Sequence, residues 1–159
     1  MILRRATEAD IPAILAIWNP LIRDTSVTFT TEEKTHEGLA AEIAARGDAF
    51  VVAEDAGRVL GFAGFGAFRA GPGYRHTAEH TVILAEGARG RGTGRALMAR
   101  LEEVARARGI HALIGAVSGE NAGAIAFHEA IGFTRAGVLP EAGYKFGRWM
   151  DLVLFHKHP

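Results

Sequence analysis

The chain has 159 residues, and its 18 basic side chains balance 18 acidic ones. A formal net charge of zero gives no reason to expect nucleic acid or an anionic membrane as the main partner. The absence of cysteine excludes disulfides, a thiolate metal site and a cysteine nucleophile.

The length fits one domain, and the chain has no internal repeat or linker, so we treat residues 1–159 as a single domain. Charge follows Met1 within a few residues, which leaves no apolar core for a signal peptide. No apolar run approaches the roughly 20 residues that span a bilayer. We therefore expect a cytoplasmic protein.

The N-terminal half predicts a strand, two helices and a hairpin. A capping box at Thr7–Asp10 opens the first helix, and Pro20 predicts a kink or an irregular end near residues 19–21. Thr25–Thr31 is expected to be extended chain or loop. The regular elements are the strand Ile2–Arg4, a helix with apolar positions from Ile11 to Ile22, a helix from about Thr35 to Arg46, and the hairpin strands Ala49–Glu54 and Val59–Phe68.

The C-terminal half alternates strands with helices. Its strands are predicted at Glu79–Leu84, at Ala112–Val117, from Phe133 onward and at Met150–Phe155; its helices are predicted at Gly92–Arg108 and Asn121–Ile131. The order β-α-α-β-β-β-α-β-α-β-β indicates a mixed α/β domain.

A glycine-rich basic loop lies between a predicted strand and the long helix. It reads Arg89-Gly90-Arg91-Gly92-Thr93-Gly94 and is followed by Arg95. Glycines let backbone N–H groups approach an anion, and a helix N-terminus adds oriented donors, so the loop suits a pyrophosphate. It lacks the Lys-Ser/Thr end of a P-loop, and its place behind a hairpin does not fit a Rossmann fingerprint. A glycine-rich turn with a solvated basic cap is the alternative.

Two motifs resemble the GNAT superfamily of N-acetyltransferases. Arg89-x-x-Gly92-x-Gly94 matches its R/Q-x-x-G-x-G/A pyrophosphate loop, and Ala124–Phe133 resembles its later helix ending in Gly-Phe. The resemblance covers roughly residues 2–135. It implies a twisted mixed β-sheet with helices on both faces and splayed central strands, and acetyl-coenzyme A as co-substrate.

A narrower resemblance runs nearly end to end. Thr25–Glu32, Tyr74–Val82 and Gly143–Asp151 resemble the phosphinothricin and methionine sulfone/sulfoximine N-acetyltransferases. Enzymes acting on phosphinothricin tend to carry histidine where this chain has Phe146. The Lys-Phe-Gly-Arg-Trp version looks more like members that prefer methionine sulfone and sulfoximine.

The resemblance implies two catalytic residues. Glu79 matches a glutamate general base that would deprotonate the substrate ammonium directly or through water. Its alternative is a strand-edge carboxylate paired with an arginine. His128 takes the place of a tyrosine general acid, and its imidazole would protonate the departing thiolate. Its alternative is a histidine that packs or hydrogen-bonds on a helix face.

Ligand-binding residues follow from the same resemblance. Val82, Ile83 and Leu84 would contact the pantetheine and thioester through their backbone, and Asn121 would bond the pantetheine arm or act as a helix N-cap. The substrate side is assigned to Arg75, which would pair with an α-carboxylate, and to Phe29, Lys145 and Trp149.

The function expected is direct acetyl transfer from acetyl-coenzyme A to the α-amino group of a small amino acid or analogue. A ternary complex without an acyl-enzyme fits the absence of cysteine, no metal is expected, and the resemblance implies a homodimer. The alternatives are a different amine, such as an antibiotic, a polyamine or a protein N-terminus, and a non-catalytic acetyl-coenzyme A sensor.

Overall fold

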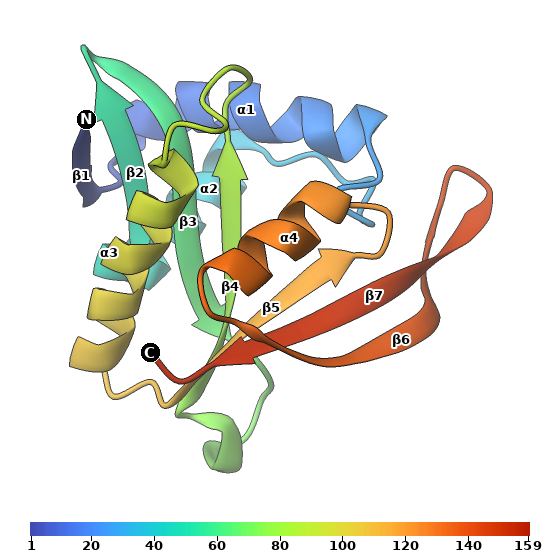
Figure 1. Ribbon diagram of the computed structural model, residues 1–159. Helices are drawn as coiled ribbons and strands as arrows, with labels where there is room; N and C mark the ends of the chain where they lie inside the picture. The colour runs from blue at the N-terminus through green and yellow to red at the C-terminus, as the bar shows by residue number, and fades with distance from the viewer.

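The computed structural model describes residues 1–159 and contains one seven-stranded sheet (Figure 1). Its strand order is β1-β2-β3-β4-β5-β7-β6, and only the β4–β5 pair is parallel. The strands are β1 (Ile2–Arg5), β2 (Phe50–Asp55), β3 (Arg58–Ala67), β4 (Thr77–Leu84), β5 (Ala112–Ser118), β6 (Thr134–Lys145) and β7 (Arg148–Lys157). The helices are α1 (Ile11–Asp24), α2 (His36–Arg46), α3 (Thr93–Ala107) and α4 (Ala122–Ala130). The predicted fold class and element order are confirmed.

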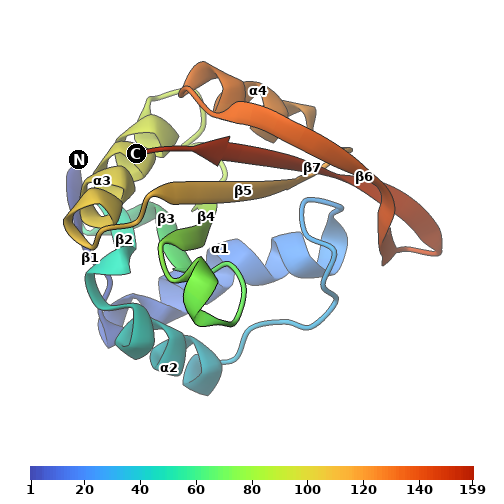
Figure 2. The ribbon, with the colours of Figure 1, turned by 90° about the horizontal axis from the view of Figure 1, so that it is seen from below.

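Helices cover both faces of the sheet, α1 and α2 on one side and α3 and α4 on the other (Figure 2). The alternation of side chains along a strand builds both cores at once. In β2, Phe50 and Val52 belong to the core under α1 and α2, whereas Val51 and Ala53 belong to the core under α3. None of the helices is long and apolar enough to cross a bilayer.

The sheet opens at its centre. β4 and β5 pair only where Thr77–Glu79 faces Ala112–Ile114, and β5 then pairs with β7 along its length. Beyond Glu79 the two parallel strands diverge, as Figure 1 shows. The predicted splayed central strands are therefore present, and residues 80–84 have free backbone groups on the side facing the gap.

The predicted irregular end of the first helix is wrong, because α1 continues through Pro20 to Asp24. Proline removes one backbone hydrogen bond, a cost that burial of Trp18 and Ile22 on either side offsets. Asn19 also fixes the chain after the helix, since its amide donates to the Lys34 carbonyl (3.0 Å) and accepts from the Lys34 N–H (2.8 Å).

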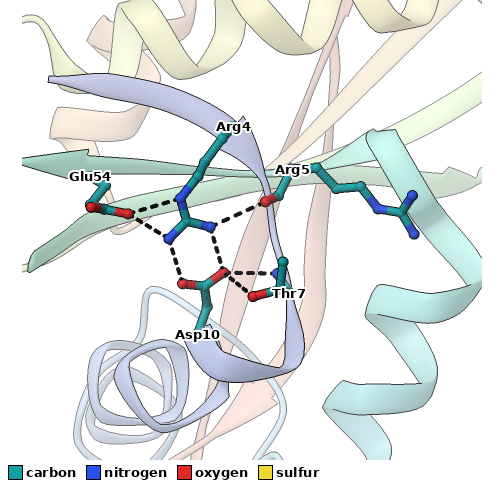
Figure 3. Close-up of polar contacts among 5 residues, drawn as sticks. All are labelled: Arg4, Arg5, Thr7, Asp10 and Glu54. Carbon is teal, nitrogen blue, oxygen red and sulfur yellow. Dashed lines mark hydrogen bonds and ion pairs between the residues drawn. The ribbon is translucent and has the colours of Figure 1, made fainter. Parts of the chain in front are cut away.

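One arginine ties the sheet edge to the start of α1 (Figure 3). Arg4 on β1 donates to both carboxylate oxygens of Asp10, at 2.9 and 2.8 Å, and to Glu54 on β2, at 2.8 and 2.6 Å. Asp10 is 5 % exposed and also accepts from the Thr7 N–H at 2.8 Å. The hydrogen bonds from Arg4 hold the pKa of Asp10 below its usual range.

Removal of Arg4 is expected to destabilise the fold. Arg4→Met leaves the buried Asp10 carboxylate without its cation, which should lower the free energy of unfolding by about 2–3 kcal/mol, since Arg4 itself is partly exposed. Urea unfolding followed by tryptophan fluorescence measures the loss. Arg100→Met, which breaks an exposed pair with Glu103, should cost less than about 0.5 kcal/mol. Equal losses in the two variants would contradict the prediction.

Candidate active site

Two cavities meet along β4 where it separates from β5. One, of about 360 Å³, runs from Arg89 and Gly90 past Leu84. The other, of about 250 Å³, contains Glu79. Both are lined by Val27, Val82, Ile83, Asn121, Ala124 and His128. A long ligand in the first cavity can therefore bring one end to a small molecule in the second.

The backbone at the outer end of the larger cavity has the geometry of a candidate anion-binding site. Gly90 and Gly92 have φ angles of 74° and 80°, which glycine adopts without strain, and Gly92 is the N-cap of α3. No side chain caps this helix, so its first N–H groups are available to a ligand. A Cβ on Gly90 or Gly92 would meet no atom within 4 Å, so the surrounding space is open.

The rest of the loop is arranged around this helix start. Arg89 is exposed and lines the cavity, whereas Thr93 is buried at 2 % exposure and Arg95 donates to the Ala130 carbonyl at 3.4 Å. Gly94 permits close contact with α4, because a Cβ there would lie 3.2 Å from the Phe127 ring.

Asn121 sits at the junction of the cavities. Its side-chain oxygen accepts from the Ala124 N–H at 3.1 Å, so it caps α4, and it lines both cavities. The N-cap role is confirmed, and it fixes the side chain where a ligand in either cavity can reach it.

The smaller cavity combines aromatic walls with two opposite charges. Trp18 and Phe29 contribute rings, and Lys34 lies with its ammonium 4.5 Å from the centre of the Trp18 ring. Glu79 forms no ion pair, so the structure does not support the alternative of an arginine-paired carboxylate. Although Glu79 remains partly open to solvent, loss of water around it raises the pKa of its carboxyl above the usual range.

His128 pairs with a second buried histidine. Its Nδ1 lies 2.7 Å from the Ala124 carbonyl, which can only accept, so Nδ1 carries the proton. Its Nε2 lies 2.9 Å from Nε2 of His80, which must donate if both rings are neutral. Gly115 leaves room for the pair, because a Cβ there would lie 2.8 Å from the His80 ring.

Burial keeps this pair neutral. It lowers the pKa of His80 to about 3, with His128 as the second cause, and it lowers the pKa of His128. His128 lines both cavities, but each ring nitrogen already has a partner. The arrangement agrees with the packing and hydrogen-bonding alternative and gives no proton for a thiolate near neutral pH.

Three residues expected on the substrate side lie outside both cavities. Arg75 is exposed and its Nε donates to Nε2 of His76 at 3.0 Å. Trp149 is 61 % exposed and packs on Tyr144 in the β6–β7 hairpin. Lys145 is buried, and all hydrogen bonds of its side-chain ammonium go to residues 22–28. Of that group, only Phe29 lines the cavity beside Glu79.

The sequence interpretation missed three cavity residues. Trp18 fits the sequence pattern only as a helix core position, Lys34 lies outside every motif, and His80 lies within a motif that implies no role for it. The only sequence signal near Lys34 is the Thr25–Glu32 motif, which contains Phe29 and ends two residues earlier. No local pattern shows that residues 34, 79 and 80 come together.

Comparison with known proteins agrees with this geometry. Residues 3–154 match the family model described as an acetyltransferase (GNAT) domain. The chain belongs to the GNAT acetyltransferase family. It is therefore an N-acetyltransferase, as the sequence resemblance implied.

Curated relatives and solved structures cover nearly the whole GNAT domain. The chain is 40 % identical to the L-methionine sulfoximine/L-methionine sulfone acetyltransferase of Pseudomonas paraeruginosa over 95 % of this chain and 90 % of that protein. It is 35 % identical to the phosphinothricin N-acetyltransferase of Alcaligenes faecalis over 97 % of this chain and 80 % of that protein.

Two solved structures superpose on this acetyltransferase with a TM-score of 0.94. The ribosomal-protein-alanine N-acetyltransferase of Brucella melitensis is 40 % identical over 100 % of both chains. The yncA protein of Salmonella typhimurium, solved with its cofactor acetyl-CoA, is 35 % identical over 99 % of this chain and 93 % of that one.

The neutral histidine pair predicts a loss of stability in mild acid. Below pH 6.5 both histidines take up protons in the unfolded chain. In the folded chain His80 stays neutral down to about pH 3, and the pKa of His128 is also lowered, so stability is present above 6.5 and falls below it. Between pH 7.5 and 5.5 the free energy of unfolding should fall by about 1.4 kcal/mol through His80, with a further loss of the same sign through His128.

Urea unfolding at the two pH values tests this for wild type and His80→Gln. The glutamine amide can still donate to His128, so the variant should lose the part of the pH dependence that comes from His80, about 1.4 kcal/mol. An unchanged pH dependence in His80→Gln would show that the pair is not its source.

Proposed function

We propose that the protein transfers the acetyl group of acetyl-coenzyme A directly to the α-amino group of a small amino acid or analogue. The observation that carries the proposal is the meeting of the two cavities at Val82 and Ile83, with Glu79 on one side and the Arg89–Gly94 loop on the other. Such an arrangement favours a ternary complex, and no cysteine is available for an acyl-enzyme.

The donor fits the larger cavity. The uncapped start of α3 offers N–H donors to the pyrophosphate, with Arg89 and Arg91 as nearby formal charges. The pantetheine arm would then follow Val82–Leu84, whose backbone faces the gap between β4 and β5. A backbone N–H from this segment would stabilise the oxyanion that forms on the thioester.

Glu79 is the proposed general base. Its raised pKa makes the carboxylate a better proton acceptor, and it faces the acceptor cavity without an ion-pair partner. The ammonium loses one proton to Glu79, directly or through water, before it attacks the thioester carbonyl. A second proton leaves the nitrogen as the amide forms, and the departing thiolate takes up one proton. We do not assign this proton to His128, because burial favours its neutral form.

The acceptor is proposed to be an amino acid or analogue with a carboxylate and a short side chain. Lys34 is the only cationic side chain lining the cavity and could pair with the carboxylate, a role first assigned to Arg75. Trp18 and Phe29 would contact the side chain. The named activities of the two curated relatives point to methionine sulfone, methionine sulfoximine and phosphinothricin as acceptors.

The homodimer implied by the resemblance stays a proposal, and one surface supports it. Five of the eight exposed large apolar side chains lie on the β6–β7 hairpin. They are Val138, Leu139, Tyr144, Phe146 and Trp149. A hairpin that extends from the body (Figure 1) and carries such side chains suits contact with a second copy.

A thiol-release assay with acetyl-coenzyme A tests the function. The panel contains the three amino-acid analogues, the same molecules with the carboxylate replaced by an amide, a polyamine and a peptide with N-terminal alanine, the last because of the Brucella melitensis relative. We expect turnover of the analogues and a Michaelis constant at least tenfold higher for the amides. Turnover of the peptide alone would overturn the amino-acid proposal.

Lys34→Met and Arg75→Met identify the carboxylate partner in the same assay. Loss of a charged hydrogen bond costs about 1.5–3 kcal/mol, so Lys34→Met should raise the Michaelis constant for the acid by about tenfold or more and leave that for the amide nearly unchanged. Arg75→Met should change neither. The reverse pattern would restore the original assignment of Arg75.

Glu79→Gln should lower the turnover number by about 10²–10⁴-fold, because glutamine cannot accept the proton. The wild-type rate should fall as pH decreases through the raised pKa of Glu79, since only the carboxylate acts as base. Glu103→Gln, on the exposed face of α3, serves as the control. Unchanged turnover of Glu79→Gln across pH 6–9 would exclude Glu79 as the base.

A further inference from the structure

Lys145 is a buried cation without a carboxylate partner. It ends β6, is 2 % exposed, and makes no ion pair. A charged group removed from water must find other polar partners, and an ammonium has three protons to donate. Burial lowers the pKa of Lys145. The partners that it finds are all on one short segment, more than 110 residues away in sequence.

That segment is the end of α1 and the loop that follows. The ammonium donates to the carbonyls of Ile22 (2.6 Å), Thr25 (2.6 Å) and Thr28 (2.8 Å), and lies 3.2 Å from the Thr28 hydroxyl. Ile22 and Thr25 are in the last turn and at the C-cap of α1, where the helix dipole favours a cation. Three carbonyls at these distances fix the course of the backbone between residues 22 and 28.

The same segment continues into the wall of the acceptor cavity. Val27, Thr28, Phe29 and Thr30 line it and belong to no helix or strand. Their positions therefore depend on contacts made elsewhere in the chain.

β6 supplies a second contact from the same face. Gly143 lies two residues before Lys145, so both project to one side of the strand. A Cβ on Gly143 would lie 2.4 Å from the Phe29 ring, so the ring packs directly on this strand. The C-terminal hairpin thus holds the backbone of the loop through Lys145 and the ring of Phe29 through Gly143.

We propose that Lys145 is a positioning residue that sets acceptor affinity without touching the acceptor, by holding residues 25–30 as the wall of the acceptor cavity. The effect on acceptor affinity rests on the proposed function, whereas the claim that Lys145 holds residues 25–30 does not depend on it. It replaces the expectation that Lys145 binds substrate directly. It also predicts a larger effect on the acceptor than on the donor, because Val27, Thr28, Phe29 and Thr30 line the acceptor cavity whereas only Val27 of this segment lines the larger cavity.

Lys145→Met tests the proposal, with Arg135→Met as the control. Arg135 also lies on β6, is exposed and pairs with Glu129 on α4, away from residues 25–30. In Lys145→Met we expect the Michaelis constant for the acceptor to rise about tenfold or more, that for acetyl-coenzyme A to change less than about twofold, and amide hydrogen exchange to increase at residues 25–30. Arg135→Met should match wild type in all three.

Gly143→Ala tests the second contact of β6 with the cavity wall, that between Gly143 and the Phe29 ring. The added methyl must displace Phe29, so the acceptor Michaelis constant should rise while Lys145 remains in place. This variant keeps the test open if Lys145→Met does not fold.

Unchanged exchange at residues 25–30 in Lys145→Met would overturn the proposal, as would equal increases in the Michaelis constants of both substrates. If the wild-type protein turns over no acceptor in the panel, the proposed function fails. The exchange measurement then still decides whether Lys145 holds the loop.

Discussion

The early separation of β4 from β5 is the constraint on which the rest of the site depends. Three residue pairs hold the strands together, while the other edge of β5 pairs with β7 from Leu113 to Ser118. The gap leaves part of the β4 backbone without sheet partners, and a folded chain satisfies such groups with water or ligand. The helices that close the two sides of the gap, α1 and α4, both contribute to the lining of the cavities. A binding groove is thus the direct result of strand pairing that stops short.

The glycine-rich loop at the outer end of this groove, with the helix start that follows it, was predictable from sequence because it is local. The positive φ angles, the helix start and the arginines all belong to one stretch from Arg89 to Arg95, and their chemistry follows from spacing. The strand and helix order was predictable for the same reason, since each element carries its own periodicity. Pro20 was misjudged because the buried side chains that keep α1 intact lie against residues far away in the chain.

The acceptor side was predicted less well because it is assembled from distant segments. Two hydrogen bonds with the Asn19 side chain fix the backbone of Lys34, whose side chain lines the cavity. The hydrogen-bond partner of His128 is His80, 48 residues away in sequence. The resemblance assigned Lys145 to substrate binding, whereas its ammonium contacts backbone carbonyls that no pattern indicates. Long-range hydrogen bonds of this kind leave no periodic signal in the residues that make them.

The contact between Gly143 and Phe29 has a consequence for how such enzymes diverge. Apart from Leu21 and Val27, the lining of the larger cavity lies between residues 82 and 128, whereas this contact joins an N-terminal loop to the C-terminal hairpin. Under the proposed function, substitutions in the hairpin would reshape the acceptor cavity and leave most of the lining of the larger cavity unchanged. Phe146 lies in that hairpin with a φ of 55°, at the position where the resemblance distinguishes acceptor preferences. Natural variation at the two ends of the chain can retune selectivity without rebuilding the machinery between them.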